Sequence, residues 1–409
     1  MKEYKGDMLS NHAILPPNSL VQRRSSDDHC LITLEQELSM YSLDRFKAAQ
    51  RLRGFSISET AQRLDINQNT LRKYLQEERT LPSDFWINAS NIFDVPESFF
   101  RQRSDDYQFD EKDINFRARA RIKAAYSNAT VEYINLAVAI NSYFSKRIKN
   151  LPTFKIIDDY NIDPCSEDAA EVAALRVRSE WGLGVQPVKN IVSLMELKGI
   201  RTFSLPLNVR EVDALSISID GQPFVLLDTQ KSAERTRFDA AHELAHIFLH
   251  IYDTKPPHQD TDYKKRESEA DRFASCFLMP TKSFLELAPK NMSIENMLKY
   301  KEYWRVSLQS INYRSHKLNM ISDWVYRSNC MKINSMGFHI NEPKPTSPDL
   351  SILHLKMLKI LDETGGFSVE QMLDEIGISR KDFDNLTFSS LTLFEDYKNS
   401  KKPKLRLLA

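Results

Sequence analysis

The sequence contains little cysteine, no dominant charge and no long apolar run. Its four cysteines stand far apart in 409 residues and form neither a CxxC pair nor a regular framework, which excludes a disulfide-stapled secreted fold. Lys plus Arg and Asp plus Glu both number 56, so no overall field indicates a nucleic-acid or membrane partner. The N-terminus lacks the apolar stretch of a signal peptide, and no later run approaches the ~18 residues of a membrane span. We therefore expect a soluble, cytoplasmic protein without membrane contact.

The strongest chemical signal is the segment AHELAH at residues 241–246. On a helix, His242 and His246 project from one face and can share a metal ion. Glu243 is turned away from the metal but can take a proton from a water bound to it, which is the metalloprotease interpretation of HExxH. Because such a match also arises by chance, the apolar residues around it matter: two unpaired histidines in an apolar helix would be costly.

A catalytic zinc needs a third protein ligand. A third histidine in the extended HExxHxxGxxH pattern is excluded, because Leu249 and Tyr252 stand where Gly and His would be. The next helical segment offers Glu267 and Asp271, four residues apart. We predict that Glu267 is the third ligand, with Glu269 as the alternative, and that Asp271 accepts the other ring N–H of the first histidine.

Three further side chains near the motif have open roles. His250 continues the same helix face, where a histidine is more often a partner of the helix C-terminus than a fourth ligand. His258 and Tyr263 are candidates for stabilising an oxyanion, and nothing in the sequence ranks them.

Residues 43 to 103 have the pattern of short helices joined by tight turns. We expect helices at 43–53, from Ser56 or Ser58 onward, at about 68–76 with Leu71 and Leu75 facing inward, at 83–93 and at 96–103. The second and third of these, with the turn at 65–67, match a helix-turn-helix. The exposed start of the third helix offers side chains that bond base edges or phosphates, namely Gln68, Asn69, Thr70, Arg72 and Lys73.

Residues 55–70, FSISETAQRLDINQNT, resemble the lambda-repressor-like, Xre-type DNA-binding domain. The resemblance implies DNA as a partner. Ile57, Asp65 and the segment 75–77 depart from the family pattern, and ten basic against eight acidic residues at 43–103 is a weak excess for DNA binding. The alternative is a helical bundle used for protein contacts.

The centre of the chain combines helices with short strands. Segments 167–181 and 188–198 have helical apolar spacing, and we expect both to pack on the HExxH helix. β-rich runs follow at 200–205, 212–219 and 224–228, the last two predicted to form a hairpin across Asp220-Gly221. Such a hairpin either binds an extended peptide by strand addition or only covers the core.

The central segment also resembles the ImmA/IrrE family of zinc metallopeptidases over roughly residues 167 to 345. The resemblance implies Zn²⁺ as cofactor, His242, His246 and Glu267 as ligands, Glu243 as the base, and a repressor-like protein as substrate. The residues that carry it are Val212–Ser216, Pro223-Phe224, Glu234–Phe238, Ala241–His246, Glu267–Ala274, Leu278–Pro280, Trp304–Ser307 and Tyr313-Arg314.

Together these patterns predict an α+β, mostly helical protein, with a helix-turn-helix bundle, a zincin-like domain with a small sheet, and a helical C-terminal module. The expected order is a flexible tail at 1–32, a DNA-binding domain at 40–103, a helical linker at 104–166, a metallopeptidase domain at 167–345 and, after a proline-rich hinge, the module at 346–409. The oligomeric state stays open.

We predict a zinc-dependent endopeptidase that cleaves a repressor to control stress or mobile-element genes. A metal-binding regulator or an antitoxin-like protein without proteolytic activity is the alternative. The presence of Glu243 favours the enzyme, because a structural zinc site has no use for a base.

Overall fold

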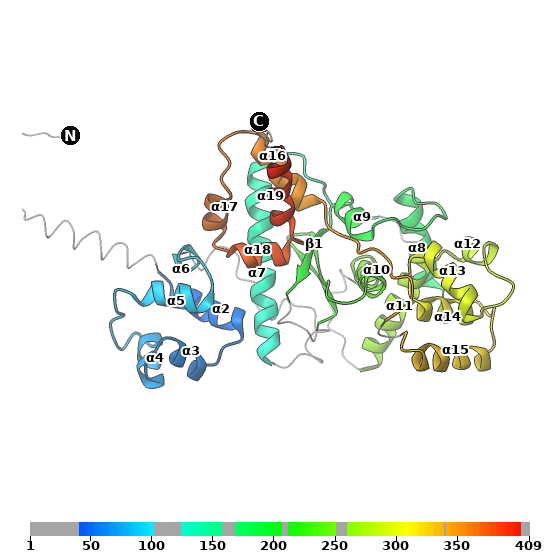
Figure 1. Ribbon diagram of the computed structural model, residues 1–409, viewed down its shortest axis with the longest axis horizontal. Helices are drawn as coiled ribbons and strands as arrows, with labels where there is room; N and C mark the ends of the chain where they lie inside the picture. The colour runs from blue at the N-terminus through cyan, green and yellow to red at the C-terminus, as the bar shows by residue number, and fades with distance from the viewer. Residues whose placement is uncertain are drawn as a thin grey trace, which may run out of the picture. The chain divides into compact units, whose positions relative to one another are not determined.

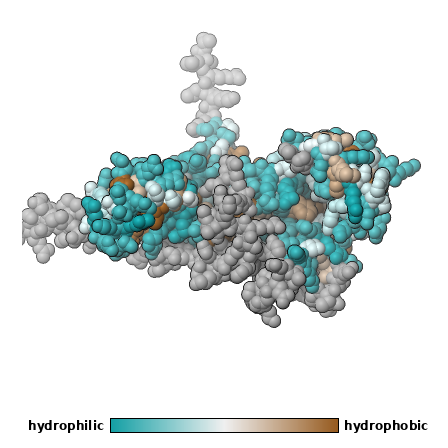
Figure 2. Space-filling model, turned by 90° about the horizontal axis from the view of Figure 1, so that it is seen from below, coloured by the Kyte–Doolittle hydropathy of each residue, from teal (hydrophilic) through white to brown (hydrophobic). Residues whose placement is uncertain are grey.

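The computed structural model describes residues 41–101, 124–157, 168–206, 212–250, 260–338 and 341–401. From Ser42 onward the chain forms one compact unit. The predicted tail at 1–32 and two parts of the predicted linker, 104–123 and 158–166, lie outside the described residues. Within the described part, no helix is long and apolar enough to cross a bilayer, and the face drawn in Figure 2 is mostly hydrophilic with scattered apolar areas.

The N-terminal region is a set of short helices with well-formed caps. Ser56, rather than Ser58, caps the second of them by accepting a hydrogen bond from the backbone N–H of Glu59. Gly54 ends the first at φ 67°, the left-handed conformation that glycine adopts without strain. The helices are α2 (Leu43–Arg53), α3 (Ile57–Arg63), α4 (Gln68–Leu75), α5 (Phe85–Phe93) and α6 (Ser98–Arg101).

Aromatic side chains form the core of this region. Phe46 stacks on Phe85 with ring centroids 5.2 Å apart and meets Phe93 edge-on at 5.1 Å. The expectation that Leu75 faces inward was wrong: it is only half-buried, and Tyr74 is buried in its place. The buried face of α4 follows i, i+3 spacing from Leu71, which is buried as predicted, so an aromatic ring rather than the last leucine meets the core.

A three-stranded sheet forms the middle of the molecule, in the order β1–β3–β2. The predicted hairpin is confirmed, since β2 (Ala214–Ile219) pairs antiparallel with β3 (Gln222–Asp228). The third strand, β1 (Arg201–Leu205), pairs parallel with β3. The turn that leads into β1 requires Gly199, where a Cβ would stand 2.1 Å from the backbone nitrogen of Phe154.

Helices cover both faces of this sheet (Figure 1). On one face the cross-strand partners Ser216 and Val225 look toward α10 (Ala233–Leu249). On the other face Phe203 lies with its ring centroid 4.8 Å from that of His354, on α16 (Leu353–Glu363). Alternate residues of one strand therefore serve two different cores, as the period of a strand requires.

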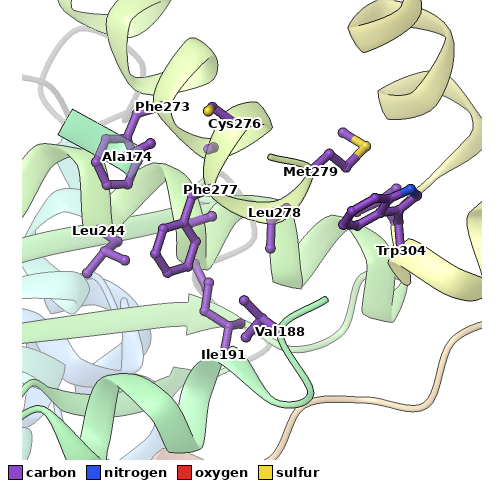
Figure 3. Packing of buried hydrophobic residues seen from close by; sticks show 14 of the residues in the cluster. Ala174, Val188, Ile191, Leu244, Phe273, Cys276, Phe277, Leu278, Met279 and Trp304 are labelled. Carbon is purple, nitrogen blue, oxygen red and sulfur yellow. The ribbon is translucent and has the colours of Figure 1, made fainter. Parts of the chain in front are cut away.

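The helix α10 is the centre of the larger core. It contacts α8 (Ala169–Glu180) and α9 (Ile191–Leu197), as predicted, and packs along α11 (Asp260–Leu278). Figure 3 shows Phe273 and Phe277 of α11 in this core together with Leu244 of α10. The rings of the two phenylalanines stack at 5.8 Å, and their i, i+4 spacing fixes which face of α11 is buried.

Four helices follow α11 and complete this core. Trp304, at the end of α13, is fully buried against Phe284 and Tyr300. The helices are α12 (Thr281–Glu286), α13 (Ile294–Trp304), α14 (Leu308–Lys317) and α15 (Asp323–Ser335).

The segment 341–352 after α15, predicted as a proline-rich hinge, is instead held by buried charges. Asp349 accepts a hydrogen bond from the backbone N–H of Ile191 at 2.8 Å and pairs with Arg237 and Arg305. The backbone N–H of Thr346 donates to Glu234 at 2.7 Å. Prolines stiffen such a segment, and its polar groups have partners on α10 and at the end of α13, so it is fixed in place rather than a hinge. We call residues 341–352 the strap.

The C-terminal region continues in helices that begin at serine caps, Ser368 and Ser379. Asp382 of α18 receives two hydrogen bonds from Arg53 of α2, at 2.9 and 2.6 Å, and both side chains are largely shielded from solvent. This region therefore contacts the N-terminal helices. It contains α16, α17 (Val369–Ile376), α18 (Arg380–Leu386) and α19 (Ser390–Lys401). The helix α7 (Ala124–Arg147) lies beside α17.

Candidate metal centre

Local sequence places the HExxH segment in the interior of a long, well-capped helix. The hydroxyl of Ser232 accepts from the backbone N–H of Arg235 to begin α10, and Glu234 puts a negative charge in the first turn. Small apolar residues, among them Ala241 and Ala245, turn inward to the core. Residues one position further along the chain project from a different face, and this is the face that presents the histidines.

Three donor atoms converge at this face. His242, His246 and Glu267 each offer one atom, and all three atoms lie within 4.8 Å of one another. The two Nε2 atoms are 3.0 Å apart, His242 Nε2 is 3.3 Å from Glu267 Oε2, and His246 Nε2 is 3.6 Å from Glu267 Oε1. Glu267 belongs to α11, which begins at Asp260, about two turns before it.

These separations fit a zinc ion. With zinc–ligand distances of about 2.0–2.1 Å, the donor atoms of a tetrahedral site lie about 3.3 Å apart. The printed separations scatter around that value, and two imidazole nitrogens with one carboxylate oxygen are a donor set that zinc prefers. The same number of protein ligands is found in catalytic zinc sites, where the fourth position is left to water or substrate.

His242 has a carboxylate behind it. Its Nδ1 lies 2.9 Å from Oδ1 of Asp271, the contact predicted from the i, i+4 spacing with Glu267. Burial alone would lower the pKa of His242, but hydrogen bonds to Asp271 and Glu267 and the charge of Glu243 raise it to about 10. The carboxylates around His242 therefore stabilise a positive charge at this position.

Glu243 is buried and held from the sheet. The hydroxyl of Ser216, on β2, donates to Oε2 of Glu243 at 2.6 Å. This contact was not anticipated from the sequence, because it depends on which face of β2 meets α10. It fixes one carboxylate oxygen, so the carboxylate sits beside the cluster in one orientation rather than several.

At the end of α10, His250 makes two contacts that were not anticipated from the sequence. His250 is the C-cap residue, as the helix-end interpretation predicted, and its side chain is buried. Its Nδ1 lies 3.0 Å from Nδ1 of His246, and its Nε2 lies 3.0 Å from Oε2 of Glu269. Glu269, the alternative ligand, is thus placed on His250 and not among the three converging donors.

A cleft of about 790 Å³ adjoins the cluster through Asp271. One wall is apolar and the other is charged, with Asp213 close to Lys231 and Arg235. The cleft follows α10 toward its N-terminus, on the face that also carries His242. Its apolar wall consists of Phe238, Tyr313, Tyr326, Ile333 and Phe338.

The remaining predicted site residues lie elsewhere. The side chains proposed for DNA contact are on α4, where Asn69, Arg72 and Lys73 are exposed and Gln68 and Thr70 are half-buried. His258 and the side chain of Tyr263 lie outside the described part of the chain.

A buried glutamate that stands between two histidine donors in the sequence, beside a small sheet with a cleft, is an arrangement that metallopeptidases use. Residues 195–316 match the model of the peptidase family M78, described as the IrrE N-terminal-like domain. The matched stretch contains the sheet, α10, α11 and all of the converging donors, so the similarity to this peptidase family covers the candidate metal centre. The N- and C-terminal regions fall outside the match. No curated protein matches the chain.

Proposed function

We propose that this protein is a zinc-dependent endopeptidase joined to a helix-turn-helix DNA-binding region. The observation that carries the proposal is the convergence of His242, His246 and Glu267 next to a buried glutamate that is held by Ser216. A site built only to stabilise the fold would close around its metal with a fourth ligand and would not keep an oriented carboxylate beside it.

Each residue has a distinct task in this proposal. His242, His246 and Glu267 hold the metal, which when bound polarises the peptide carbonyl and lowers the pKa of water to about 7. Glu243 takes the proton of the attacking water and passes it to the leaving amine, and Ser216 keeps that carboxylate aimed. Asp271 holds His242 in the tautomer whose Nε2 is free of a proton.

Two features suit an extended peptide substrate. Among the described strands, only β3 pairs with β2, so the other edge of β2 offers backbone groups for strand addition next to Glu243. The cleft then receives side chains on one side of the scissile bond, and its wall of Phe238, Tyr313 and Ile333 favours large apolar ones.

The substrate and the DNA partner follow from the combination of regions. We propose that α4 enters a major groove with Asn69, Arg72 and Lys73 forward, which brings the peptidase to DNA or to a DNA-bound protein. A repressor-like protein is the substrate class that such a tether would serve, and its cleavage would release the genes that it controls.

The test is metal analysis and cleavage on the same samples. Wild type, Glu243→Gln and Glu286→Gln are purified, and zinc is measured before each is incubated with repressors encoded by neighbouring genes. Glu286 is an exposed residue of α12, so its change is a matched control for the loss of one carboxylate.

The proposal expects about one zinc per chain in all three proteins, with cleavage lost only in Glu243→Gln. Zinc without cleavage of any candidate would favour a metal-binding regulator instead. A wild type that binds no zinc would overturn the ligand assignment.

A further inference from the structure

The two histidines of the cluster are supported in different ways. His242 meets a carboxylate directly, at 2.9 Å from Asp271, whose side chain is 49% exposed. His246 meets another imidazole, that of His250, and only through it a carboxylate, that of Glu269. Both side chains of this histidine pair are buried, with exposed fractions of 8% and 7%.

We infer that His250 and Glu269 are positioning residues that fix the tautomer and ring orientation of His246 as a metal ligand. This inference rests on the proposed zinc site. The three side chains form a line that leads from the carboxylate oxygen of Glu269 through two imidazole rings to Nε2 of His246, the atom that faces Glu267.

The placement of protons along this line has one solution when His246 binds a metal. A nitrogen that binds a metal has no proton, so the proton of neutral His246 is on Nδ1. That N–H points at Nδ1 of His250 over 3.0 Å, which must therefore accept and be without a proton itself. The proton of His250 is then on Nε2, from which it donates to Glu269.

Every other arrangement of two neutral rings fails. If His250 carried its proton on Nδ1, two N–H groups would face each other across 3.0 Å, and Glu269 would lose its donor. Glu269 therefore selects the tautomer of His250, and His250 selects that of His246. Lys265 approaches the opposite carboxylate oxygen, Oε1, at 3.8 Å, so it does not compete for the oxygen that His250 uses.

Position in the fold explains why such support is needed. His250 is the C-cap residue of α10, and residues at a helix end are held less firmly than those in its interior. The backbone N–H of His250 donates to the carbonyl of His246, which fixes the distance between the two along the helix. Glu269, two residues before Asp271 on α11, completes the line from the second helix that carries a ligand. Both ligand histidines are thus oriented by α11.

The test measures metal binding, which does not require a substrate. Zinc affinity is determined by competition with a chromophoric chelator, and the Co²⁺-loaded protein is examined by visible absorption, which reports the coordination geometry. The variants are His250→Phe, which keeps a ring without an acceptor, and His250→Asn, whose Oδ1 occupies the place of Nδ1 and accepts. Glu269→Leu removes the carboxylate, and Lys265→Met is the control.

We expect His250→Phe and Glu269→Leu to weaken zinc binding about 10- to 100-fold, as the loss of such support does elsewhere. His250→Asn should recover most of the affinity and the wild-type Co²⁺ spectrum, because it restores the acceptor. Lys265→Met should match the wild type. Rescue by asparagine separates orientation from packing, since phenylalanine fills the space better than asparagine does.

Two results would overturn the inference while leaving the proposed function intact. In one, His250→Phe and Glu269→Leu bind zinc within about twofold of the wild type with unchanged Co²⁺ spectra. In the other, His250→Asn is as weak as His250→Phe, which would assign the effect to packing. If one variant does not fold, as judged by thermal unfolding without metal, the other tests the same line. A wild type that binds no zinc would overturn the proposed function and this inference together.

Discussion

Replacing Lys301 by Met removes the cation that pairs with two shielded glutamates without changing the length of the side chain much. The side chain of Lys301 is 0% exposed, and it pairs with Glu234, which is 2% exposed, and with Glu342, which is 10% exposed and lies 2.8 Å away. The substitution leaves two carboxylates facing each other out of contact with water. Breaking a buried pair in this way lowers the free energy of unfolding by about 3–5 kcal/mol.

A second estimate from protonation gives the same size. An ordinary glutamate has a pKa of 4.5, and at 1.36 kcal/mol per pKa unit, keeping one carboxyl neutral at pH 7 costs about 3.4 kcal/mol. In the variant, burial and the second carboxylate raise the pKa of Glu234 above its unfolded value. In the wild type, burial raises that pKa, but the hydrogen bonds from Lys301 and from the backbone N–H of Thr346 outweigh it and lower the pKa.

The sign of the pH dependence follows. In the variant, the raised pKa means that the neutral form is stabilised at low pH and that stability is lost as the pH rises through the folded pKa. The difference in unfolding free energy between wild type and Lys301→Met, from urea denaturation, should therefore be largest at pH 7 and shrink toward pH 5. A difference below about 1 kcal/mol, or one that does not change with pH, would refute this reasoning.

Three further outcomes are expected. Ser216→Ala should leave the zinc content unchanged and lower kcat on a cleaved repressor by about 10-fold or more, because Glu243 loses a charge-assisted hydrogen bond; an unchanged kcat would remove Ser216 from the site. Burial raises the pKa of Glu171, but its bonds to Arg314 lower it overall, so the stability that it contributes is present above pH 4.5 and is lost as the pH falls further; Glu171→Gln should flatten that part of the stability profile in denaturation experiments. Replacing Arg72 and Lys73 together by Ala should weaken DNA binding at all sequences and reduce the slope of log affinity against log salt by about 2, and a slope that does not move would favour protein contacts for α4.

Much of the secondary structure could be predicted because its signals are local. The serine cap at Ser56 and the hairpin around Asp220-Gly221 depend on a few adjacent residues, and the mostly helical fold with a small sheet is confirmed. Helix starts could not be predicted as well. The helix α11 begins at Asp260, about two turns before Glu267, the first residue that the sequence analysis placed on it. The division into domains stays a prediction.

In the candidate site, too, the contacts set by local spacing could be predicted and those set by long-range packing could not. Spacing within one helix brings His242 beside His246 and gives Glu267 and Asp271 a common face, and the structure brings these four together. The role of His250 depends on how α10 is rotated against α11, and that rotation is set by side chains spread over the whole core. No window of the sequence contains that information, because the partners are 19 residues apart on two helices.

The strap at 341–352 connects α10 to the C-terminal helices, which gives α10 a role besides carrying ligands. Glu234 and Arg237 bind the strap near the start of α10, and His242 lies on the same helix, between one and two turns after Arg237. The strap continues directly into α16, so it links the C-terminal helices to the start of α10 through Glu234 and Arg237. A shift of α16 would therefore be passed to α10, the helix that carries two of the three donor atoms.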